Sequence, residues 1–299
     1  MRGAQVGVHA MSITPFTKDG AIDKSLLRAH LRFLSASGVG VYIAGQGSGE
    51  GDLLAVHEKI ALYQIAASEL HTTTQVVAAG IGLVGSTSSI RDLAVGAEAA
   101  GVGAIQVLGP RPGPIPLRAD ELEAYFRTII ESVRCDVHVS NNTVLTGDEL
   151  PITIVERLVD DYEHVRVINV TDPRPNVLHG YVSQIVDRMG ARVEVRVGMA
   201  ASAVTAHALG ARGLLSFEAN VAPRLVANAW KAIESGDATA LAPLLQLNAA
   251  LARGGNPRSL KAALAIMGRD GGSLRAPFLG LTPAQYRDLE RELKALALV

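Results

Sequence analysis

The stretch AIQVLGPRPGPIPLRADELEAYFRTIIESVRCDVHV, residues Ala104–Val139, contains the unit whose repetition decides the fold. It begins with a short apolar run, Ala104–Leu108, and passes through glycine and proline into a longer segment, Arg118–Val133. A second apolar run follows at Cys135–Val139. Short β-branched runs bounded by Gly, Pro, Asn or Asp are typical of strands, and longer segments of helical period are typical of helices. The stretch therefore predicts a strand, a helix and a second strand.

The same alternation extends outward in both directions. It predicts eight strands, at Gly7–Ile13, Val39–Ala44, Gln75–Gly80, Ala104–Leu108, Cys135–Val139, Val165–Val170, Arg192–Val197 and Gly213–Ser216. It predicts a helix after each strand, at Asp23–Ser37, Ala55–Leu70, Thr87–Ala100, Arg118–Val133, Pro151–Asp161, Val177–Met189, Met199–Leu209 and Ala222–Ser235. Strict alternation of this kind requires a parallel sheet with helical crossovers.

Eight such units favour a closed barrel, because open doubly wound sheets usually stop at about five to seven strands. The first strand ends in Thr14-Pro15-Phe16, without a glycine fingerprint for a dinucleotide. We therefore predict an α/β fold, a (β/α)8 TIM barrel over residues 1–236. Three more helical segments, Asp237–Ala252, Pro257–Met267 and Pro283–Leu298, predict a C-terminal helical extension, residues 237–299, packed on the barrel and offering a surface for oligomer contacts.

Composition excludes several classes of function. The 299 residues carry a formal net charge of −1 without an acidic or basic block, which argues against binding to nucleic acid or to an anionic membrane. The single cysteine, Cys135, excludes an intrachain disulfide and a cysteine-based zinc site. No apolar stretch approaches the roughly 20 residues of a membrane helix, and the N-terminus lacks the apolar region of a signal peptide. We expect a soluble cytoplasmic protein.

Active sites of such barrels lie at the C-terminal ends of the strands. The polar and glycine residues expected there, as substrate-binding candidates, are Thr14, Gly47, Ser48, Gly49, Glu50, Asn141, Asn142, Asn169, Thr171 and Glu218. The loop Gly45–Glu50 is glycine-rich and runs toward a helix, so its backbone N–H groups suit a carboxylate or phosphate. The alternative is a turn that only reverses the chain.

Several segments resemble one known family. ITPFTKDGAID, GQGSGEGDLL and SNNTVLTG are similar to its first loop, its glycine-rich motif and its stretch after strand 5. GLLSFEANVAPRLVANAWKAIESGD, NPRSLKAALAIMG and LRAPFLGLT are similar to its eighth strand and helix and its C-terminal region. These matches run in order from residue 7 to residue 283. Because of these matches, the chain resembles the dihydrodipicolinate synthase/N-acetylneuraminate lyase family.

The resemblance implies a class I aldolase-type enzyme, a carbon–carbon or carbon–oxygen lyase or a synthase without a cofactor. In that family a lysine at the end of strand 6 forms a Schiff base with an α-keto acid. A tyrosine after strand 5 relays protons. The glycine-rich loop binds the carboxylate, and the position of Glu50 mostly fixes the structure of that loop. The resemblance also implies a homo-oligomer, a tetramer or a dimer.

The residues of the ancestral reaction are replaced. The lysine position aligns with Asn169 and the tyrosine position with Ser140; Leu145 and Pro112 stand where some members carry arginine and tyrosine. An amide nitrogen is not nucleophilic and forms no imine, and a serine hydroxyl is far less acidic than a phenol.

No other lysine is expected to substitute. Of the six, Lys18 lies on the correct face but in a polar turn, and the others are Lys24, Lys59, Lys231, Lys261 and Lys294. We expect these five on helices or on the extension, with an ordinary pKa near 10.4 that makes a lysine a poor nucleophile.

Two further residues are candidates for acid or base chemistry. His138 lies in strand 5 two residues before Ser140, and points to the same side; the alternative is a hydrogen-bonded histidine within the barrel. Asp172 forms a polar cluster with Asn169 and Thr171, or serves as a plain helix N-cap. No metal site is expected, because no ligand spacing appears among the acidic and histidine candidates.

Two main hypotheses follow. In the first, a divergent family member binds a small keto or sugar acid at the C-terminal face of the barrel without Schiff-base chemistry. In the second, a catalytically inactive barrel is retained as a ligand-binding or oligomer-partner subunit. A lyase or aldolase that uses a non-lysine mechanism on another substrate is a further alternative.

Overall fold

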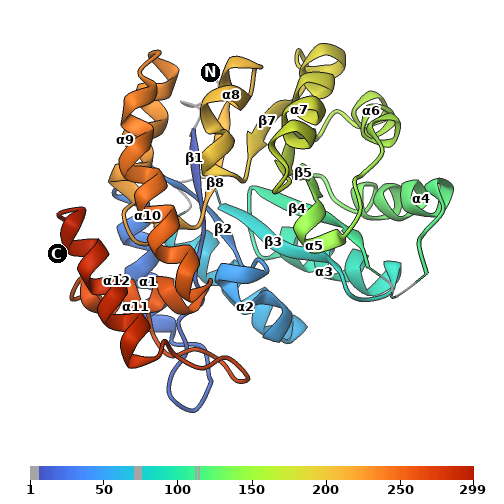
Figure 1. Cartoon of the computed structure of the whole chain (residues 1–299). Helices are drawn as coiled ribbons and strands as arrows, with labels where there is room; N and C mark the ends of the chain where they lie inside the picture. Colours follow the sequence, from blue (N-terminus) through green and yellow to red (C-terminus); the bar gives the residue numbers. More distant parts are fainter. Residues whose placement is uncertain (1–6, 71–75, 112, 114) are drawn as a thin grey trace. The chain divides into compact units, whose positions relative to one another are not determined.

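The computed structural model describes residues 7–70, 76–111, 113 and 115–299. Eight strands form a closed barrel in chain order (Figure 1), and every pair of strands with a recorded register is parallel. The strands are β1 (Val8–Met11), β2 (Gly40–Ile43), β3 (Val76–Leu83), β4 (Ala104–Pro110), β5 (Asp136–Asn142), β6 (Val165–Thr171), β7 (Glu194–Val197) and β8 (Gly213–Ser216). The predicted (β/α)8 barrel is confirmed.

Helices follow the strands. Those around the barrel are α1 (Lys24–Ser35), α2 (Val56–Leu70), α3 (Thr87–Ala99), α4 (Ala119–Ile130), α6 (Ile152–Asp161), α7 (Pro175–Met189), α8 (Ala203–Ala208) and α9 (Pro223–Glu234). The predicted extension consists of α10 (Leu241–Gly254), α11 (Arg258–Ile266) and α12 (Pro283–Ala295). Caps agree with local sequence: Asp23 accepts hydrogen bonds from the backbone of Ser25 and Leu26 at the start of α1.

Strand β5 ends later than the sequence predicted. It continues through Ser140, Asn141 and Asn142, which the sequence placed in a loop. The reason is tertiary, since each of these residues pairs with a residue of β6. A one-turn helix, α5 (Thr143–Thr146), follows at once, and no pattern in the sequence predicted it.

The chain groups into two compact units. One comprises residues 1–76 with 215–299, and the other comprises residues 77–214. The first unit therefore joins the beginning of the chain to its C-terminal helices. The predicted boundary at residue 236 stays a prediction.

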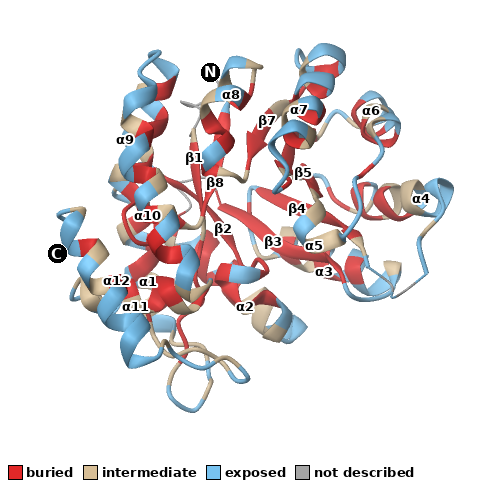
Figure 2. Cartoon of the chain, viewed as in Figure 1, coloured by how far each residue is buried: buried red, intermediate tan, exposed pale blue. Residues whose placement is uncertain are grey.

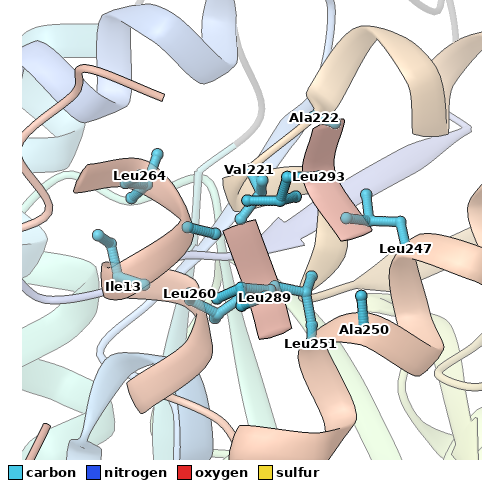
Figure 3. Close-up of a cluster of buried hydrophobic side chains, with 11 residues drawn as sticks. Ile13, Val221, Ala222, Leu247, Ala250, Leu251, Leu260, Leu264, Leu289 and Leu293 are labelled. Atoms are coloured by element: carbon cyan, nitrogen blue, oxygen red, sulfur yellow. The ribbon is translucent and has the colours of Figure 1, made fainter. Parts of the chain in front are cut away.

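The C-terminal helices of the first unit pack on residues that follow β1 and β8. Ile13, Val221 and Ala222 lie against leucines and alanines of α10, α11 and α12 (Figure 3). The leucines Leu247, Leu251, Leu260 and Leu293 are almost completely buried. Figure 2 shows the strands as largely buried and the outer faces of the helices as exposed. Burial of such apolar surface is the main force that holds the extension in place.

Two features are absent from the described residues. No helix among them is long and apolar enough to cross a membrane. Within the same residues, no three His, Cys, Asp or Glu side chains are grouped so that they could hold a metal ion.

Candidate functional site

The register of β4 to β8 places the candidate residues in two parallel rows. One row runs through Leu108, Ser140, Asn169, Arg196 and Gly213, each paired with the next. Directly paired residues point to the same side of a sheet, and residues two apart on one strand do so as well. All five therefore share one side.

The second row lies one step nearer the N-terminal ends of the strands. It contains Gln106, His138, Val167 and Glu194. The residues that lie between the two rows along each strand are apolar, for example Val139, Ile168 and Val195. Crossover helices cover the outer side of a barrel, so the apolar set belongs there and the two polar rows face inward.

Ser140 lies at the centre of a buried hydrogen-bond cluster. Its Oγ accepts a hydrogen bond from Gln106 Nε2 at 2.8 Å and another from Asn169 Nδ2 at 3.2 Å. The three residues are only 2–4% exposed. The structure thus brings together Asn169 and Ser140, the two positions that the resemblance aligns with a lysine and a tyrosine, and connects them by a hydrogen bond between an amide and a hydroxyl.

Arg196 adds a buried charge to the same row. Its Nε donates to Glu194 Oε1 at 2.6 Å; the Arg196 side chain is 3% exposed and that of Glu194 is 9% exposed. Gly213 on the next strand leaves room for it, because a Cβ there would lie 2.9 Å from Arg196 Cγ. Buried ions persist when they are paired, as these are.

The side chains of Asn141 and Asn142 accept hydrogen bonds from the backbone. The Asn141 Oδ1 accepts from Leu150 N at 3.0 Å, and the Asn142 Oδ1 accepts from Leu145 N at 3.2 Å, which caps α5. Their alternation along β5 also places Asn141 on the opposite side of the sheet from Ser140. Both side chains are therefore structural in this arrangement, and the expected substrate contacts of the pair stay a prediction.

Asp172 is held by its neighbours. Its carboxylate accepts from Arg174 N at 2.8 Å, from the Arg174 guanidinium and from Thr143 Oγ1 at 2.7 Å. The Arg174 hydrogen bonds hold the pKa of Asp172 well below its usual range. The N-cap position of α7 is Arg174, so Asp172 is not itself the cap. A carboxylate held ionised in this way is a weak proton acceptor at neutral pH.

Thr171 and His138 complete the candidates in this unit. The Thr171 side chain lies against Gly198, where a Cβ would come within 2.2 Å of Thr171 Oγ1. His138 is completely buried in the row below Ser140. Pro112, which aligns with a tyrosine of some relatives, lies outside the described residues.

The glycine-rich loop belongs to the other unit, after β2. Gly47, Ser48 and Gly49 form a short 3-10 turn, and Glu50 adopts a left-handed backbone with φ of 51°. Thr14 Oγ1 donates to the carbonyl oxygen of Gly49 at 2.7 Å. Ser48 Oγ accepts from Asn256 Nδ2 at 2.7 Å. These bonds fix the shape of the loop from both sides.

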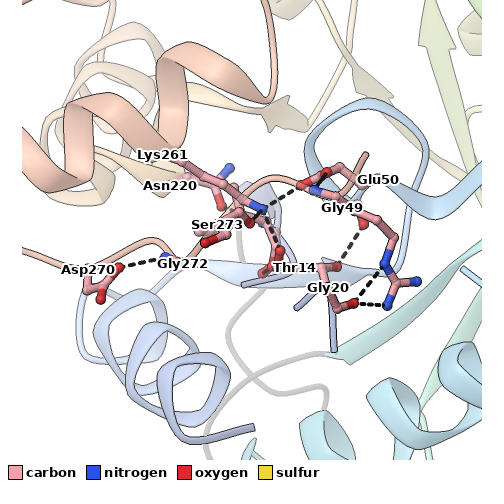
Figure 4. Close-up of polar contacts among 12 residues, drawn as sticks. Thr14, Gly20, Gly49, Glu50, Asn220, Lys261, Asp270, Gly272 and Ser273 are labelled. Carbon is pink, nitrogen blue, oxygen red and sulfur yellow. Dashed lines mark hydrogen bonds and ion pairs between the residues drawn. The ribbon is translucent and has the colours of Figure 1, made fainter. Parts of the chain in front are cut away.

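Glu50 forms an ion pair with Lys261 of α11. The Lys261 Nζ donates to Glu50 Oε1 at 2.5 Å, to the Thr14 carbonyl at 2.8 Å and to the Ser273 carbonyl at 2.7 Å (Figure 4). The second Glu50 oxygen accepts from Arg275 N at 2.9 Å. These contacts tie Glu50 to Lys261 and to the backbone of Arg275, and its expected substrate contact stays a prediction.

Lys261 corrects one expectation. The sequence placed it with exposed lysines of ordinary pKa, whereas its side chain is 4% exposed. Burial lowers its pKa, and the neighbouring Glu50 carboxylate partly offsets that effect. Three acceptors surround the nitrogen, which matches the three N–H donors of an ammonium group. The amine is therefore protonated and is no nucleophile.

Glu218 is buried after β8 in the same unit. It accepts from Ser216 Oγ at 2.5 Å and from Asn248 Nδ2 at 2.6 Å. Burial raises the pKa of its carboxyl group, and the two hydrogen bonds oppose the shift. The side chain therefore points into protein contacts with Ser216 and α10, and its expected substrate contact stays a prediction.

Sequence reasoning missed Gln106, Arg196 and Lys261. The signal for Arg196 was present, because Glu194 and Arg196 alternate with valines in a strand and charged residues are rarely buried without a partner. Gln106 was also a polar residue within an apolar strand. Nothing local marked Lys261, because two of its three hydrogen-bond partners, Thr14 and Glu50, lie more than two hundred residues away.

Comparison with known proteins agrees with the fold. Residues 4–296 match the Dihydrodipicolinate synthetase family. An uncharacterized DapA-like lyase of Halobacterium salinarum is 30% identical, over 99% of this chain and 97% of its own length. The 4-hydroxy-tetrahydrodipicolinate synthase of Methanopyrus kandleri is 28% identical, over 98% of this chain and 97% of its own.

A solved structure is similarly close. YagE, a prophage protein of the dihydrodipicolinic acid synthase family from E. coli K12, was solved in complex with pyruvate. It is 25% identical and superposes with a TM-score of 0.87 over 99% of this chain and 100% of that one. Together with the closed barrel, these matches show that the chain belongs to the dihydrodipicolinate synthetase family.

Proposed function

We propose that this protein binds a small keto acid or sugar acid at the C-terminal ends of the barrel strands, and that it acts without a Schiff base. The observation that carries the proposal is the hydrogen bond between Asn169 Nδ2 and Ser140 Oγ. An amide and a hydroxyl occupy the positions that hold a lysine and a tyrosine in the resembling family. They can orient and polarise a carbonyl group, but the amide nitrogen cannot attack it.

The distribution of lysines supports the same conclusion. None of the six lies between residues 77 and 214, the segment that contains β4 to β7, all of β3 after Val76, and the first half of β8. Lys261, which is buried, has its nitrogen surrounded by Glu50 and two carbonyl oxygens. An imine needs a neutral amine within reach of the carbonyl carbon, and this chain supplies none at the family position.

The ligand class follows from the resemblance and from the pyruvate in the YagE complex. Asn169 and Ser140 would contact the carbonyl or hydroxyl oxygens of the acid. The resemblance assigns carboxylate binding to the loop of Gly47, Ser48 and Gly49, whose clustered backbone N–H groups favour an anion. We also propose that the protein is cytoplasmic and forms a homo-oligomer, a tetramer or a dimer, as the resemblance implies.

A second candidate rests on the same replacements. Loss of both the lysine and the tyrosine position also suits a subunit without catalytic activity that binds a ligand or an oligomer partner. Turnover distinguishes the two candidates, since only an enzyme converts the acid that it binds. A third reading, a lyase or aldolase with a non-lysine mechanism, predicts turnover together with an unmodified protein.

Calorimetric titration with a panel of keto acids and sugar acids tests the proposal. We expect at least one acid to bind, and Asn169→Leu to weaken that binding about tenfold, the effect of losing one hydrogen bond to a charged or polarised group. Asn228→Leu, an exposed asparagine of α9, is the matched control and should bind like the wild type. Absence of binding by every acid, or equal binding by Asn169→Leu, would contradict the proposal.

A further inference from the structure

The hydrogen bonds around Ser140 leave its hydroxyl hydrogen without an acceptor. Gln106 Nε2 and Asn169 Nδ2 both donate to Ser140 Oγ. A serine oxygen has two lone pairs and one O–H donor, so two incoming N–H groups occupy both lone pairs. Among the described residues, no hydrogen bond donated by Ser140 is recorded. Ser140 is therefore left as a pure donor.

A buried hydroxyl group that donates no hydrogen bond destabilises the folded state. Ser140 is 2% exposed, and leaving a buried donor unpaired costs about 1–3 kcal/mol. Such groups are few in native proteins, and each has a physical explanation, such as an ordered water, an ion or a functional role. A ligand oxygen that binds at this position recovers the lost hydrogen bond.

The two donors also set the direction of that O–H bond. Gln106 pairs with His138, one step nearer the N-terminal end of β5, and Asn169 flanks Ser140 from β6. The oxygen is roughly tetrahedral, so its hydrogen takes the position that the Cβ atom and these two donors leave open. Because one donor lies below and one beside it, the hydroxyl hydrogen is directed toward the C-terminal side, where the acid is proposed to bind.

We propose that Ser140 donates its hydroxyl hydrogen to the carbonyl oxygen of the bound keto acid, and that Gln106 is the positioning residue that enforces this direction. The inference rests on the proposed function and extends it, because it assigns the polarising group and a residue that supports it. No bond is made or broken in this step. The carbonyl becomes more electrophilic because a hydrogen bond withdraws electron density from its oxygen.

Nuclear magnetic resonance of pyruvate labelled with 13C at its keto carbon tests the assignment. Polarisation of the carbonyl moves this resonance downfield, so the bound wild type should show a downfield displacement. Ser140→Ala should lose most of the displacement and bind pyruvate about tenfold more weakly. Ser140→Thr keeps a hydroxyl group and should restore both, whereas Gln106→Leu should show an intermediate displacement because the hydroxyl can then turn.

Controls separate this effect from general damage. Ser132→Ala removes a hydroxyl whose hydrogen bond, among the residues that the structure describes, goes to the Ile129 carbonyl in α4, and it should behave like the wild type. Thermal unfolding of each variant checks that it is folded. Unchanged displacement and affinity in Ser140→Ala, with pyruvate still bound, would overturn the inference and leave the proposed function intact.

Neutron diffraction of the protein without ligand gives an independent reading. We expect the deuterium of the Ser140 hydroxyl to point away from both amides, and the amide deuterium atoms of Gln106 and Asn169 to point at Ser140. A hydroxyl deuterium directed at either amide oxygen would overturn the inference whether or not any acid binds. A wild type that fails to bind pyruvate or any other acid would instead overturn the proposed function.

Discussion

Lys261 of α11 and Glu50 of the glycine-rich loop form a buried ion pair, with 2.5 Å between Nζ and Oε1. The pair joins the C-terminal helices to the loop that follows β2, within one compact unit. Both side chains are almost completely buried, so each charge depends on the other. The loop that the resemblance assigns to carboxylate binding is thus held in shape by a residue of the extension.

Removal of the lysine should destabilise the protein strongly. Lys261→Met leaves the Glu50 carboxylate buried without its partner, and loss of one member of a buried pair costs about 3–5 kcal/mol. We expect that loss in the free energy of unfolding, measured by urea denaturation. Lys231→Met, an exposed lysine on α9, is the matched control and should change stability little.

A double variant tests whether the loss of stability comes from the unpaired Glu50 charge. Glu50→Gln combined with Lys261→Met removes both charges, so it should be more stable than Lys261→Met alone. If Lys261→Met unfolded with the same midpoint as the wild type, the ion pair would not hold the loop.

His30 should make stability depend on pH. Burial lowers its pKa from 6.5 to about 4; the hydrogen bond with Asn220 opposes the shift and the charge of Arg269 adds to it. Between these two pKa values the unfolded chain binds a proton that the folded chain does not. Stability is therefore full above pH 6.5. It falls as the pH drops toward about 4, by about 3 kcal/mol in total.

Substitution isolates this contribution. His30→Gln keeps an N–H donor for the Asn220 oxygen but does not titrate, so the difference in unfolding free energy between the wild type and the variant should change over that window. His57→Gln, an exposed histidine of α2, is the control. A constant difference across the window would show that His30 is not held neutral.

The contribution of Glu218 to stability should depend on pH in the opposite direction from that of His30. Burial raises the pKa of its carboxyl group above 4.5, so the folded state favours the protonated acid. Stability from this group is present at low pH and is lost as the pH rises through 4.5 toward the folded pKa. Glu218→Gln resembles the protonated form and keeps an acceptor for Asn248, so it should stabilise the protein at neutral pH.

The gain should shrink as the pH is lowered to about 4, where the wild-type carboxyl is also protonated. Urea denaturation of both proteins at several pH values measures it. Glu163→Gln, at an exposed position, serves as the control. A variant less stable than the wild type at neutral pH would mean that the ionised form of Glu218 is the one the fold requires.

The sequence predicted the barrel because strand and helix signals are local. Short valine-rich runs and their glycine and proline boundaries depend on neighbours in the chain, and eight of them sufficed to favour closure. It also predicted that Asn169 and Ser140 belong to one site, and the register of β5 and β6 places them side by side. The pairing of these two positions came from the resemblance, and their role in one site stays a prediction.

The features that the sequence did not predict depend on contacts between distant segments of the chain. The Gln106 contact with Ser140 requires the register of β4 and β5, which no local pattern reports. Asn142 looked like a ligand because it is a polar residue at a strand end, yet its oxygen caps α5, a helix that the sequence did not show. Lys261 looked exposed because α11 is amphipathic, and only the folded chain shows which partners its charged end meets.

Trapping with borohydride tests the central claim, that this site works without a Schiff base. The protein is incubated with pyruvate and sodium borohydride, and its intact mass is measured beside that of a family member that retains the lysine. Our account predicts that the mass of this protein stays unchanged while the lysine-containing relative gains one reduced pyruvyl group. A mass increase in this protein, located by peptide mapping on any of its lysines, would contradict the account.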